Sequence, residues 1–396
     1  MGKYLSQVWA VIVMNVRSLP QRLWMSVAAV FAVSVVVAVL LSFLAMVEGF
    51  QATIEGTGSE DVAIVTRSGS RSELNSTLSR DTVNIVSTAA GVAKNAAGDP
   101  IYSPELFVVV DGIKKSSQTE ANIPLRGIDP AGFDLRDHVG ITAGRMFTPG
   151  NNEIIVGEGV LREFSGFELG KKVRFGKTTW EVVGAFSTGG SAFESELWAD
   201  TRTVQTQFQR GSSYRTMRIR LAESGNIDGL KELIETDPRL VLDVETEADY
   251  FAEQAGTLNY TITMGWAIAV VMSVGALAGA LNTMYTSVSS RSTEIATLRA
   301  LGFNNSSAFI GTLVESIVLS LVGGVVGTIL AFSFIDGLSS STMGANFTQV
   351  VFAFELTPAL FEKGIIMALV IGFVGGFFPA FQAARLPVVV AFTRGN

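Results

Sequence analysis

The residues LWMSVAAVFAVSVVVAVLLSFLAMV, from Leu23 to Val47, contain no charged side chain. At 1.5 Å per residue, about 25 helical residues exceed the roughly 30 Å of hydrocarbon in a bilayer. A cleaved signal peptide has an apolar region of only about 7–15 residues, and no clear small-residue cleavage site precedes Glu48. Residues 23–47 are therefore predicted to form an uncleaved first transmembrane helix.

Three more apolar stretches lie towards the C-terminus, at 254–290, 316–335 and 364–384; the second reaches back to Ala300 if Glu315 is tolerated. About 20 apolar residues are too many for most buried core helices. The expected transmembrane helices are 254–288, 306–335 and 364–385.

The charges of the connecting segments predict the orientation. Residues 1–22 and the tail 386–396 carry basic side chains and no acid, and the loop 289–305 carries two arginines against Glu294. The loop 336–363 carries three acids against Lys363. By the positive-inside rule, both termini and the loop 289–305 are cytoplasmic. The protein is expected in the cell inner (cytoplasmic) membrane, with residues 48–253 and 336–363 in the periplasm or outside.

Composition divides the chain in the same way. Charged residues make up 16%, against about 25% in soluble domains, and the mean hydropathy is +0.39. Residues 48–253 hold 21 basic and 31 acidic residues, whereas the remainder holds 8 and 5, so nets of −10 and +3 give the total of −7. This asymmetry indicates an acidic outer domain carried on a membrane part.

Residues 1–22 are expected to form a cytoplasmic amphipathic helix that lies in the inner interface. Its apolar positions fall at helical spacing, and Pro20 would end it. The stripe consists of Tyr4, Leu5, Val8, Trp9, Ile12, Val13 and Val16.

The outer domain, residues 48–253, alternates strand-like and helix-like pieces, which predicts an α+β fold. Residues 122–200 are richest in strand and turn signals and are expected to be a β-rich inserted subdomain. The expected strands are 62–66, 106–110, 154–156, 179–186, 216–221 and 241–246, and the expected helices are 71–86 and 228–235, with the Asn226 region as a cap for the second.

Little in the sequence indicates catalysis. Gly176-Lys177-Thr178 lacks the earlier glycine of a phosphate-binding loop, because that position is Lys171, and is expected to be a hairpin turn. The pairs Glu194/Glu196 and Glu245/Glu247 alternate as on a solvated strand face. With no Cys and only His138, expected at the surface, no zinc site or nucleophile–base pair is expected. We therefore expect no catalytic residues, metal or cofactor in this chain.

Small residues four positions apart indicate helix faces that pack closely in membranes. The pairs are Gly275 and Gly279, Gly323 and Gly327, and Gly372 and Gly376.

The segment Arg291-Ser-Thr-Glu294-Ile295-Ala-Thr-Leu298-Arg299-Ala-Leu301-Gly302 places apolar side chains on one face of a short helix in a cytoplasmic loop. Such an amphipathic helix is a suitable docking element, and Gly302 can end it in the left-handed conformation.

This segment resembles the core signature of FtsX-like/MacB-type ABC transporter permeases, and nearly the whole chain shares the resemblance. Glu315-Ser316 and the glycine run 323–327 follow it, and the ending with Pro379, Ala383, Arg385 and Pro387 is similar to the close of that family's domain. The outer domain resembles the MacB-type periplasmic core, a mixed α/β porter-like part with a β-rich insertion, in its Arg126-Gly-Ile-Asp-Pro130, Gly144-Arg-x-Phe-Thr148, Glu153-x-x-Val-Gly157, Gly170-Lys-x-Val173 and Val182-Val-Gly184 motifs.

The resemblance implies a type VII ABC system that acts as a dimer, with a second copy or a paralogue. ATP and Mg would be bound by a cytoplasmic ABC ATPase dimer on separate chains, because this chain has no Walker motif. Residues 291–302 would be the coupling helix, and ATP-driven motion would be relayed to the outer domain. The partners implied are a periplasmic adaptor and outer-membrane channel, or a lipoprotein or hydrolase, and no nucleic acid.

Three functions follow from these features. The leading one is export or extraction of a substrate on the outer side of the membrane. The second is activation of a cell-wall hydrolase by the same motion. The third is secondary transport through Glu315, since an acid within a membrane helix is costly to bury. The resemblance at Glu315-Ser316 implies a structural or coupling role for this pair. A proton relay is disfavoured, because no second intramembrane acid or His accompanies Glu315.

Overall fold

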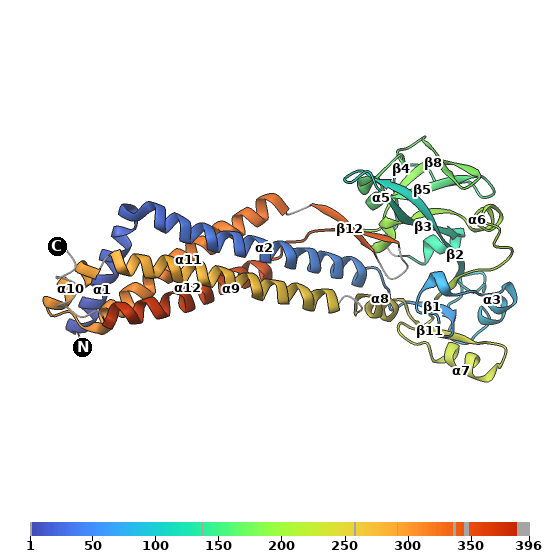
Figure 1. Cartoon of the computed structure of the whole chain (residues 1–396). Coiled ribbons are helices and arrows are strands. Elements are labelled where there is room, and N and C mark those ends of the chain that lie inside the picture. Colours follow the sequence, from blue (N-terminus) through green and yellow to red (C-terminus); the bar gives the residue numbers. More distant parts are fainter. Residues whose placement is uncertain are drawn as a thin grey trace. The chain divides into compact units, whose positions relative to one another are not determined.

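In the computed structural model, the described residues are 2–136, 138–256, 259–290, 292–335, 338–343 and 348–385. The chain divides into two compact units (Figure 1). The first, the membrane unit, comprises residues 1–48, 260–338 and 354–396. The second, the outer unit, comprises 49–259 and 339–353.

The membrane unit is helical. Its elements are α1 (Gly2–Ser18), a 3₁₀ turn at Leu19–Arg22, α2 (Leu23–Glu55), α9 (Asn259–Ser290), α10 (Ser292–Ala300), α11 (Asn305–Ile335) and α12 (Pro358–Arg385). Among the described residues, four helices are long and apolar enough to cross a membrane: α2, α9 over 266–290, α11 and α12. Four membrane helices with an α+β outer domain were predicted.

The core of the membrane unit forms where α2, α11 and α12 meet. Val37, Leu41 and Ala368 are fully buried there. Near the end of the unit, the carboxylate of Glu48 accepts a hydrogen bond from Thr357 Oγ1 (2.9 Å) and pairs with Lys363 Nζ (3.0 Å). The polar contacts at Glu48 therefore tie α2 to α12 where the charge-free run of α2 stops.

The outer unit is a mixed α/β structure. Its strands are β1 (Val62–Arg67), β2 (Tyr102–Lys114), β3 (Glu120–Ile128), β4 (Gly140–Gly144), β5 (Glu153–Gly157), β6 (Phe164–Ser165), β7 (Lys172–Phe175), β8 (Thr178–Ser187), β9 (Leu197–Asp200), β10 (Thr216–Arg220), β11 (Leu242–Thr246), β12 (Ser339–Met343) and β13 (Gln349–Ala353). Its helices are α3 (Arg80–Val86), α4 (Pro130–Asp134), α5 (Glu158–Glu163), α6 (Thr201–Gln207), α7 (Asp228–Thr236) and α8 (Glu247–Gly256), with 3₁₀ turns η2 (Glu73–Asn75) and η3 (Ala192–Ser195).

Eleven strands of the described residues join in one sheet, in the order β11-β1-β10-β2-β3-β9-β5-β8-β4, with β6 beside β2 and β7 beside β8. The long strand β2 connects two halves: its first residues pair with β10, and residues 106–113 pair with β3. One apolar core lies under the β1/β10/β11 half around Met217 and Ile219. A second lies in the β-rich half around Leu125, Trp180 and Leu197.

The hairpin β12–β13 comes from the segment between α11 and α12 but belongs to the outer unit. Val351 is buried in the core of the β-rich half, and its amide N–H donates to Ser195 Oγ (2.8 Å). Ser339 Oγ donates to Glu163 Oε1 (2.8 Å). The residues 336–363, expected only as a loop, thus include two strands of the outer domain.

Two local predictions need correction. The expected helix 71–86 is a 3₁₀ turn followed by α3, which starts only at Arg80 because the Ser79 side chain accepts the N–H of Thr82 as an N-cap. The Asn226 region was expected to cap the helix that the structure shows as α7, but the N-cap residue is Ile227, which has no capping side chain. Asn226, one residue earlier, accepts the N–H of Asp228 through Oδ1 (3.1 Å). The hairpin turn at Gly176 and Lys177, between β7 and β8, is confirmed.

We expect Ser195→Ala to loosen the β12–β13 hairpin, because the buried N–H of Val351 loses its acceptor. An unsatisfied buried donor costs about 1–3 kcal/mol. Amide hydrogen exchange of residues 348–353 in the full chain would measure the loss of protection. Ser165→Ala, which removes only the partly exposed bond to Ile113 O (3.2 Å), is the control and leaves the hairpin unchanged. Equal protection in both variants would contradict this role for Ser195.

Candidate functional site

The predicted coupling segment forms α10, and its end is closed by a Schellman motif. Gly302 has a φ of +93°, Gly302 N–H donates to Arg299 O (3.0 Å) and Phe303 N–H donates to Leu298 O (3.1 Å). A residue with a side chain would be strained at this φ, so the glycine fixes where the helix stops. Arg291 lies outside the described residues.

One face of α10 is held inside the membrane unit. Ile295 and Ala296 are buried, and Ile295 packs with Val288, Ala308 and Ala383. A small cavity of about 20 Å³ lies between α10, α1 and the start of α11, lined in part by Val11, Leu298, Arg299 and Phe303. On the other side, Glu294 is exposed, and Leu301, just after α10, exposes 73% of its surface. A rigidly held helix therefore presents an apolar side chain outward.

The amphipathic N-terminal helix packs against α11 through residues that the predicted stripe did not include. Val11 and Asn15 are buried, and a Cβ on Gly311 would lie 2.5 Å from Val11 Cγ1. Trp9 remains 68% exposed. With Glu294 it lines an open groove of about 680 Å³, together with Ala10, Val13, Met14, Arg17, Ser18 and Gln21.

The intramembrane pair Glu315 and Ser316 lies on a buried face of α11. Glu315 is 3% exposed, and Ser316 Oγ donates to the carbonyl of Gly372 on α12 (2.8 Å). The hydroxyl of Ser316 thus links α11 to α12 at Gly372.

The small-residue pairs differ in what faces them. A Cβ on Gly323 or Gly327 would clash with α2, and one on Gly372 or Gly376 would clash with Ser320 or Ser316 of α11. These four glycines therefore allow close helix contacts within one chain. Around Gly275 and Gly279, apart from the adjoining backbone of α9 itself, none of the described residues comes within 4 Å of an added Cβ.

The residues of the C-terminal motif lie at the end of α12. Pro379 and Ala383 are buried, and the Arg385 guanidinium stacks over the Phe381 ring at 4.1 Å. Pro387 lies outside the described residues.

A second candidate site was not recognised from sequence: a cluster of buried charged side chains in the outer unit. Its members, each at most 6% exposed, are Glu73, Glu105, Arg126, Arg136, Glu196, Arg218 and Glu247. Glu196 and Glu247, expected on solvated strand faces, are buried members of this cluster, so that expectation was wrong. Glu194 of the same pattern is also buried, and Ser187 Oγ and the amides of Thr188 and Gly190 donate to it.

Arg126 of β3 and Arg218 of β10 are the two hubs of the cluster. Arg126 binds Glu196 through two parallel hydrogen bonds (2.6 and 2.7 Å) and also contacts Glu73 (2.8 Å). Arg218 binds Glu247 (2.6 Å) and the other oxygen of Glu73 (2.7 Å). Since β3 and β10 belong to different halves of the sheet, the cluster joins these halves.

Glu105 of β2 lies between the hubs. It accepts two bonds from Arg136 (both 2.8 Å) and one each from Arg126 and Arg218. Burial opposes its ionisation, but three guanidiniums outweigh burial and hold the pKa of Glu105 below its usual range. For Glu247 burial prevails over the attraction of Arg218, so its pKa is raised.

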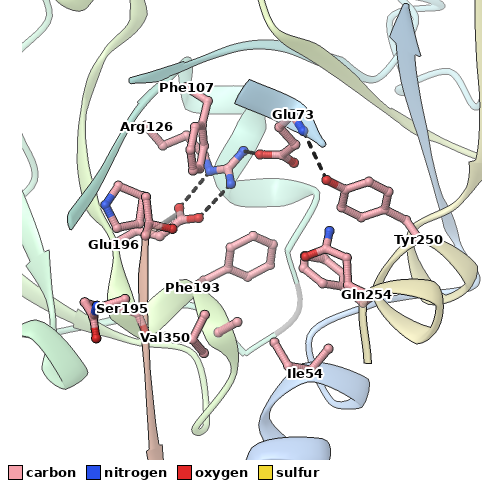
Figure 2. Close-up of a pocket in the computed structure, with 15 residues that line it drawn as sticks. Ile54, Glu73, Phe107, Arg126, Phe193, Ser195, Glu196, Tyr250, Gln254 and Val350 are labelled. Carbon is pink, nitrogen blue, oxygen red and sulfur yellow. Dashed lines mark hydrogen bonds and ion pairs between the residues drawn. The ribbon is translucent and has the colours of Figure 1, made fainter. Parts of the chain in front are cut away.

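The ring of Phe193 lies against the guanidiniums of Arg136, Arg218 and Arg126, at 4.5, 5.5 and 5.7 Å from the ring centre. An aromatic face attracts a cation, most strongly where water is excluded. Figure 2 shows Phe193 between the Arg126–Glu196 pair and Tyr250, whose hydroxyl accepts the N–H of Glu73 (3.2 Å).

A cavity of about 40 Å³ adjoins the cluster (Figure 2). Its walls come from α2 (Ile54), η2, β3, η3, α8 and β13 (Val350). The cluster therefore lies where the last turn of α2, the first turn of α8 and the β12–β13 hairpin meet within the outer unit. No group of residues able to hold a metal ion occurs in the described part of the chain.

We expect Arg126→Leu to destabilise the outer unit by about 3–5 kcal/mol, because three buried carboxylates lose a compensating charge. Hydrogen exchange of β2 and β3 under increasing urea would measure the change. Arg145→Gln is the matched control, because its pair with Glu153 (2.7 Å) involves an exposed guanidinium, and water and salt screen such pairs. Equal losses of stability in the two variants would show that the buried pairs contribute no more than an exposed one.

A pH dependence follows from Glu247. The pKa of Glu247 is higher in the folded state than in the unfolded state, where it is about 4.3. The stabilisation that protonated Glu247 gives the folded state is therefore complete below about pH 4.3. It is lost as the pH rises through the folded-state pKa. Glu247→Gln keeps an acceptor for Arg218 and removes this titration. We expect the variant to gain stability relative to the parent chain as the pH rises above about 4, as measured by hydrogen exchange of α8 and β10. Glu232→Gln, at an exposed position, is the control, and a constant difference across this range would contradict the expectation.

Comparisons with known proteins cover most of the chain. The model of the MacB-like periplasmic core domain matches residues 26–237, and that of the FtsX-like permease C-terminal matches residues 266–388. Two curated relatives, from Bradyrhizobium diazoefficiens and Paracoccus denitrificans, carry the name macrolide export ATP-binding/permease protein MacB. Each is 26% identical to this chain, over 69% and 80% of it and 44% and 48% of the relative. The chain thus spans about half the length of these relatives.

Two solved structures align with about half of the chain. The periplasmic region of MacB from Actinobacillus actinomycetemcomitans aligns with 53% of this chain and 95% of its own, at 17% identity and a TM-score of 0.37. The extracellular domain of the ABC-type transporter YknZ from Gram-positive bacteria aligns with 47% of this chain and all of its own, at 16% identity and a TM-score of 0.36.

Proposed function

Because this chain belongs to the FtsX-like, MacB-type ABC transporter permeases, we propose that it relays the ATP-driven motion of an ABC ATPase to its outer domain. In this proposal the cargo is exported or extracted on the outer side of the membrane and does not pass through the membrane centre. ATP and Mg²⁺ would be bound by the ATPase.

The observation that carries the proposal is the construction of α10. The buried Ile295 fixes this helix among α1, α9, α11 and α12, so a force on α10 would reach all of them. The exposed Leu301 at its end would enter a pocket on the ATPase, with Glu294 and Arg299 around it. Apolar anchors surrounded by polar groups are typical of protein interfaces.

The outer domain would receive the motion as a rigid body. Buried charge pairs join its two halves, and separating the halves would leave charges buried without a partner, which is costly. The two halves would therefore move together. The chain passes between the two units four times: in α2, at the start of α9 and on each side of the β12–β13 hairpin. Motion in the membrane unit would therefore reach the outer unit by several routes.

A second permease copy or a paralogue would complete the assembly. The uncovered face of α9 around Gly275 and Gly279, together with the exposed Val271 and Val274, supports a contact between membrane helices there. Both termini and α10 would be cytoplasmic. The names of the relatives favour a small-molecule cargo handed to a periplasmic adaptor and an outer-membrane channel.

Replacing the residues around the end of α10 would test the proposal. We expect Leu301→Asp, and separately Glu294→Ala with Arg299→Ala, to lower the stimulation of the co-purified ATPase at least tenfold. Loss of a central anchor costs about 2 kcal/mol or more, which is roughly thirtyfold in affinity. ATP turnover in nanodiscs is the readout, with hydrogen exchange of the outer unit to show that folding is intact.

Leu169→Asp is the matched control, since Leu169 is a 54% exposed leucine of the outer unit. Unchanged complex formation and turnover in the α10 variants would overturn the coupling role. Transport that persists without any ATPase but stops in Glu315→Gln would indicate secondary transport. Stimulation of a cell-wall hydrolase in place of cargo movement would identify a regulator.

A further inference from the structure

A groove of about 470 Å³ opens on the outer unit, at the end where β1 stops and β11 and β10 start. Arg67, the last residue of β1, pairs with Leu242 of the edge strand β11. Leu78 and Tyr214 exchange backbone hydrogen bonds (2.8 and 2.9 Å) and hold the two loops beside it. The lining residues are Arg67, Thr77, Leu78, Ser79, Thr82, Arg210, Ser212, Ser213, Arg239, Val241 and Leu242.

The groove is basic, although the region 48–253 as a whole carries a net charge of −10. Three arginines line it, and none of the described residues that line it is acidic. Arg239 is paired with Asp237, but among the described residues no carboxylate lies within ion-pair distance of Arg67 or Arg210. Both are exposed, so their guanidinium groups are available to a ligand.

A fourth arginine adds to the positive charge from behind. Arg215 Nη1 donates to Ser76 O (2.7 Å) and Thr77 Oγ1 (3.0 Å), which fixes its guanidinium next to the groove wall. Burial and the nearby Arg210 lower the pKa of Arg215, as expected where like charges gather without a counter-ion. The groove thus gathers cations, and within the described parts of the chain no carboxylate forms an ion pair with Arg67 or Arg210.

We propose that this groove binds a phosphate group, held between the guanidiniums of Arg67 and Arg210. A guanidinium donates two parallel N–H bonds to a phosphate. A phosphate monoester has three acceptor oxygens and nearly two negative charges. It therefore matches two arginines, one at the end of β1 and one in the loop after α6, better than one carboxylate does. The Ser212 hydroxyl and the Ser79–Thr82 hydroxyl pair (2.8 Å) supply further polar groups on the same wall.

The remainder of the ligand would lie along the apolar side of the groove. Val241 exposes 61% of its surface, and the buried Leu78 and Leu242 also line the groove. The volume falls within the range of about 300–1,000 Å³ usual for small-molecule sites. Phosphate of this kind comes either from a lipid headgroup or from a free phosphate ester, and the two sources differ in whether an acyl chain improves binding.

Binding to the full chain in a maltoside detergent, which contains no phosphate, would test the proposal. Calorimetric titrations would use inorganic phosphate, glycerol 3-phosphate, dihexanoyl phosphatidate and, as a carboxylate probe, a tetraglutamate peptide. We expect the phosphate probes to bind with an affinity that falls as salt is raised. Arg67→Gln with Arg210→Gln should weaken this binding at least about tenfold, since a hydrogen bond to a charged group is worth roughly that factor or more.

The control is Arg174→Gln with Lys177→Gln, which removes the same charge from the exposed β7–β8 turn. Unchanged affinity in the control and unchanged exchange of β1 and β10 in both variants would locate the effect in the groove. Phosphatidate at least tenfold tighter than glycerol 3-phosphate would identify a lipid source, and equal affinity a free ester. Equal weakening in both double variants, or binding of the peptide without the phosphate probes, would overturn the proposal.

Discussion

The buried carboxylate of Glu105 can exist in the outer unit only because three guanidiniums surround it. The guanidiniums belong to Arg126 of β3, Arg218 of β10 and Arg136, which lies just after α4. These three elements must therefore meet at Glu105. Removing a charge from water is expensive, and only close and complete pairing offsets the cost. The positions of the two halves of the sheet, the last turn before β9 and the first turn of α8 all depend on this requirement.

The membrane unit is held by a different interaction. Between α2, α11 and α12 no comparable group of charges occurs in the described residues; glycines let the backbones approach, and a hydroxyl bonds to a carbonyl at Ser316 and Gly372. Under the proposed function, helices held by such contacts would shift at a lower cost than an outer unit held by buried charge pairs.

Much of this architecture could be predicted from the sequence, because a charge-free run such as Leu23–Val47 has few other structures open to it. The end of α10 was predictable as well, since Gly302 is a local signal.

The buried charge cluster could not be predicted from the sequence. Glu196 and Glu247 alternate with their neighbours as exposed residues would, and their partners lie 70 and 29 positions away along the chain. The one available signal was an arginine between apolar neighbours in a strand, as at Arg218 between Met217 and Ile219. The start of α3 was missed for a simpler reason: three serines lie between residues 71 and 79, and only Ser79 accepts the N–H that caps the helix.

The β12–β13 hairpin has a consequence for how this domain can be inherited and engineered. Its strands lie more than 90 residues beyond the end of β11 in sequence, yet Val351 fills the same apolar core as Leu125 and Trp180. The outer domain is therefore not a contiguous genetic module. A fragment cut at the boundaries of residues 49–259 would leave the space of Val351 open and Ser195 without its backbone partner, whereas one that also carries 339–353, rejoined by a short linker, would restore both. Recombination between relatives would likewise have to exchange two separate gene segments at once to keep this core filled.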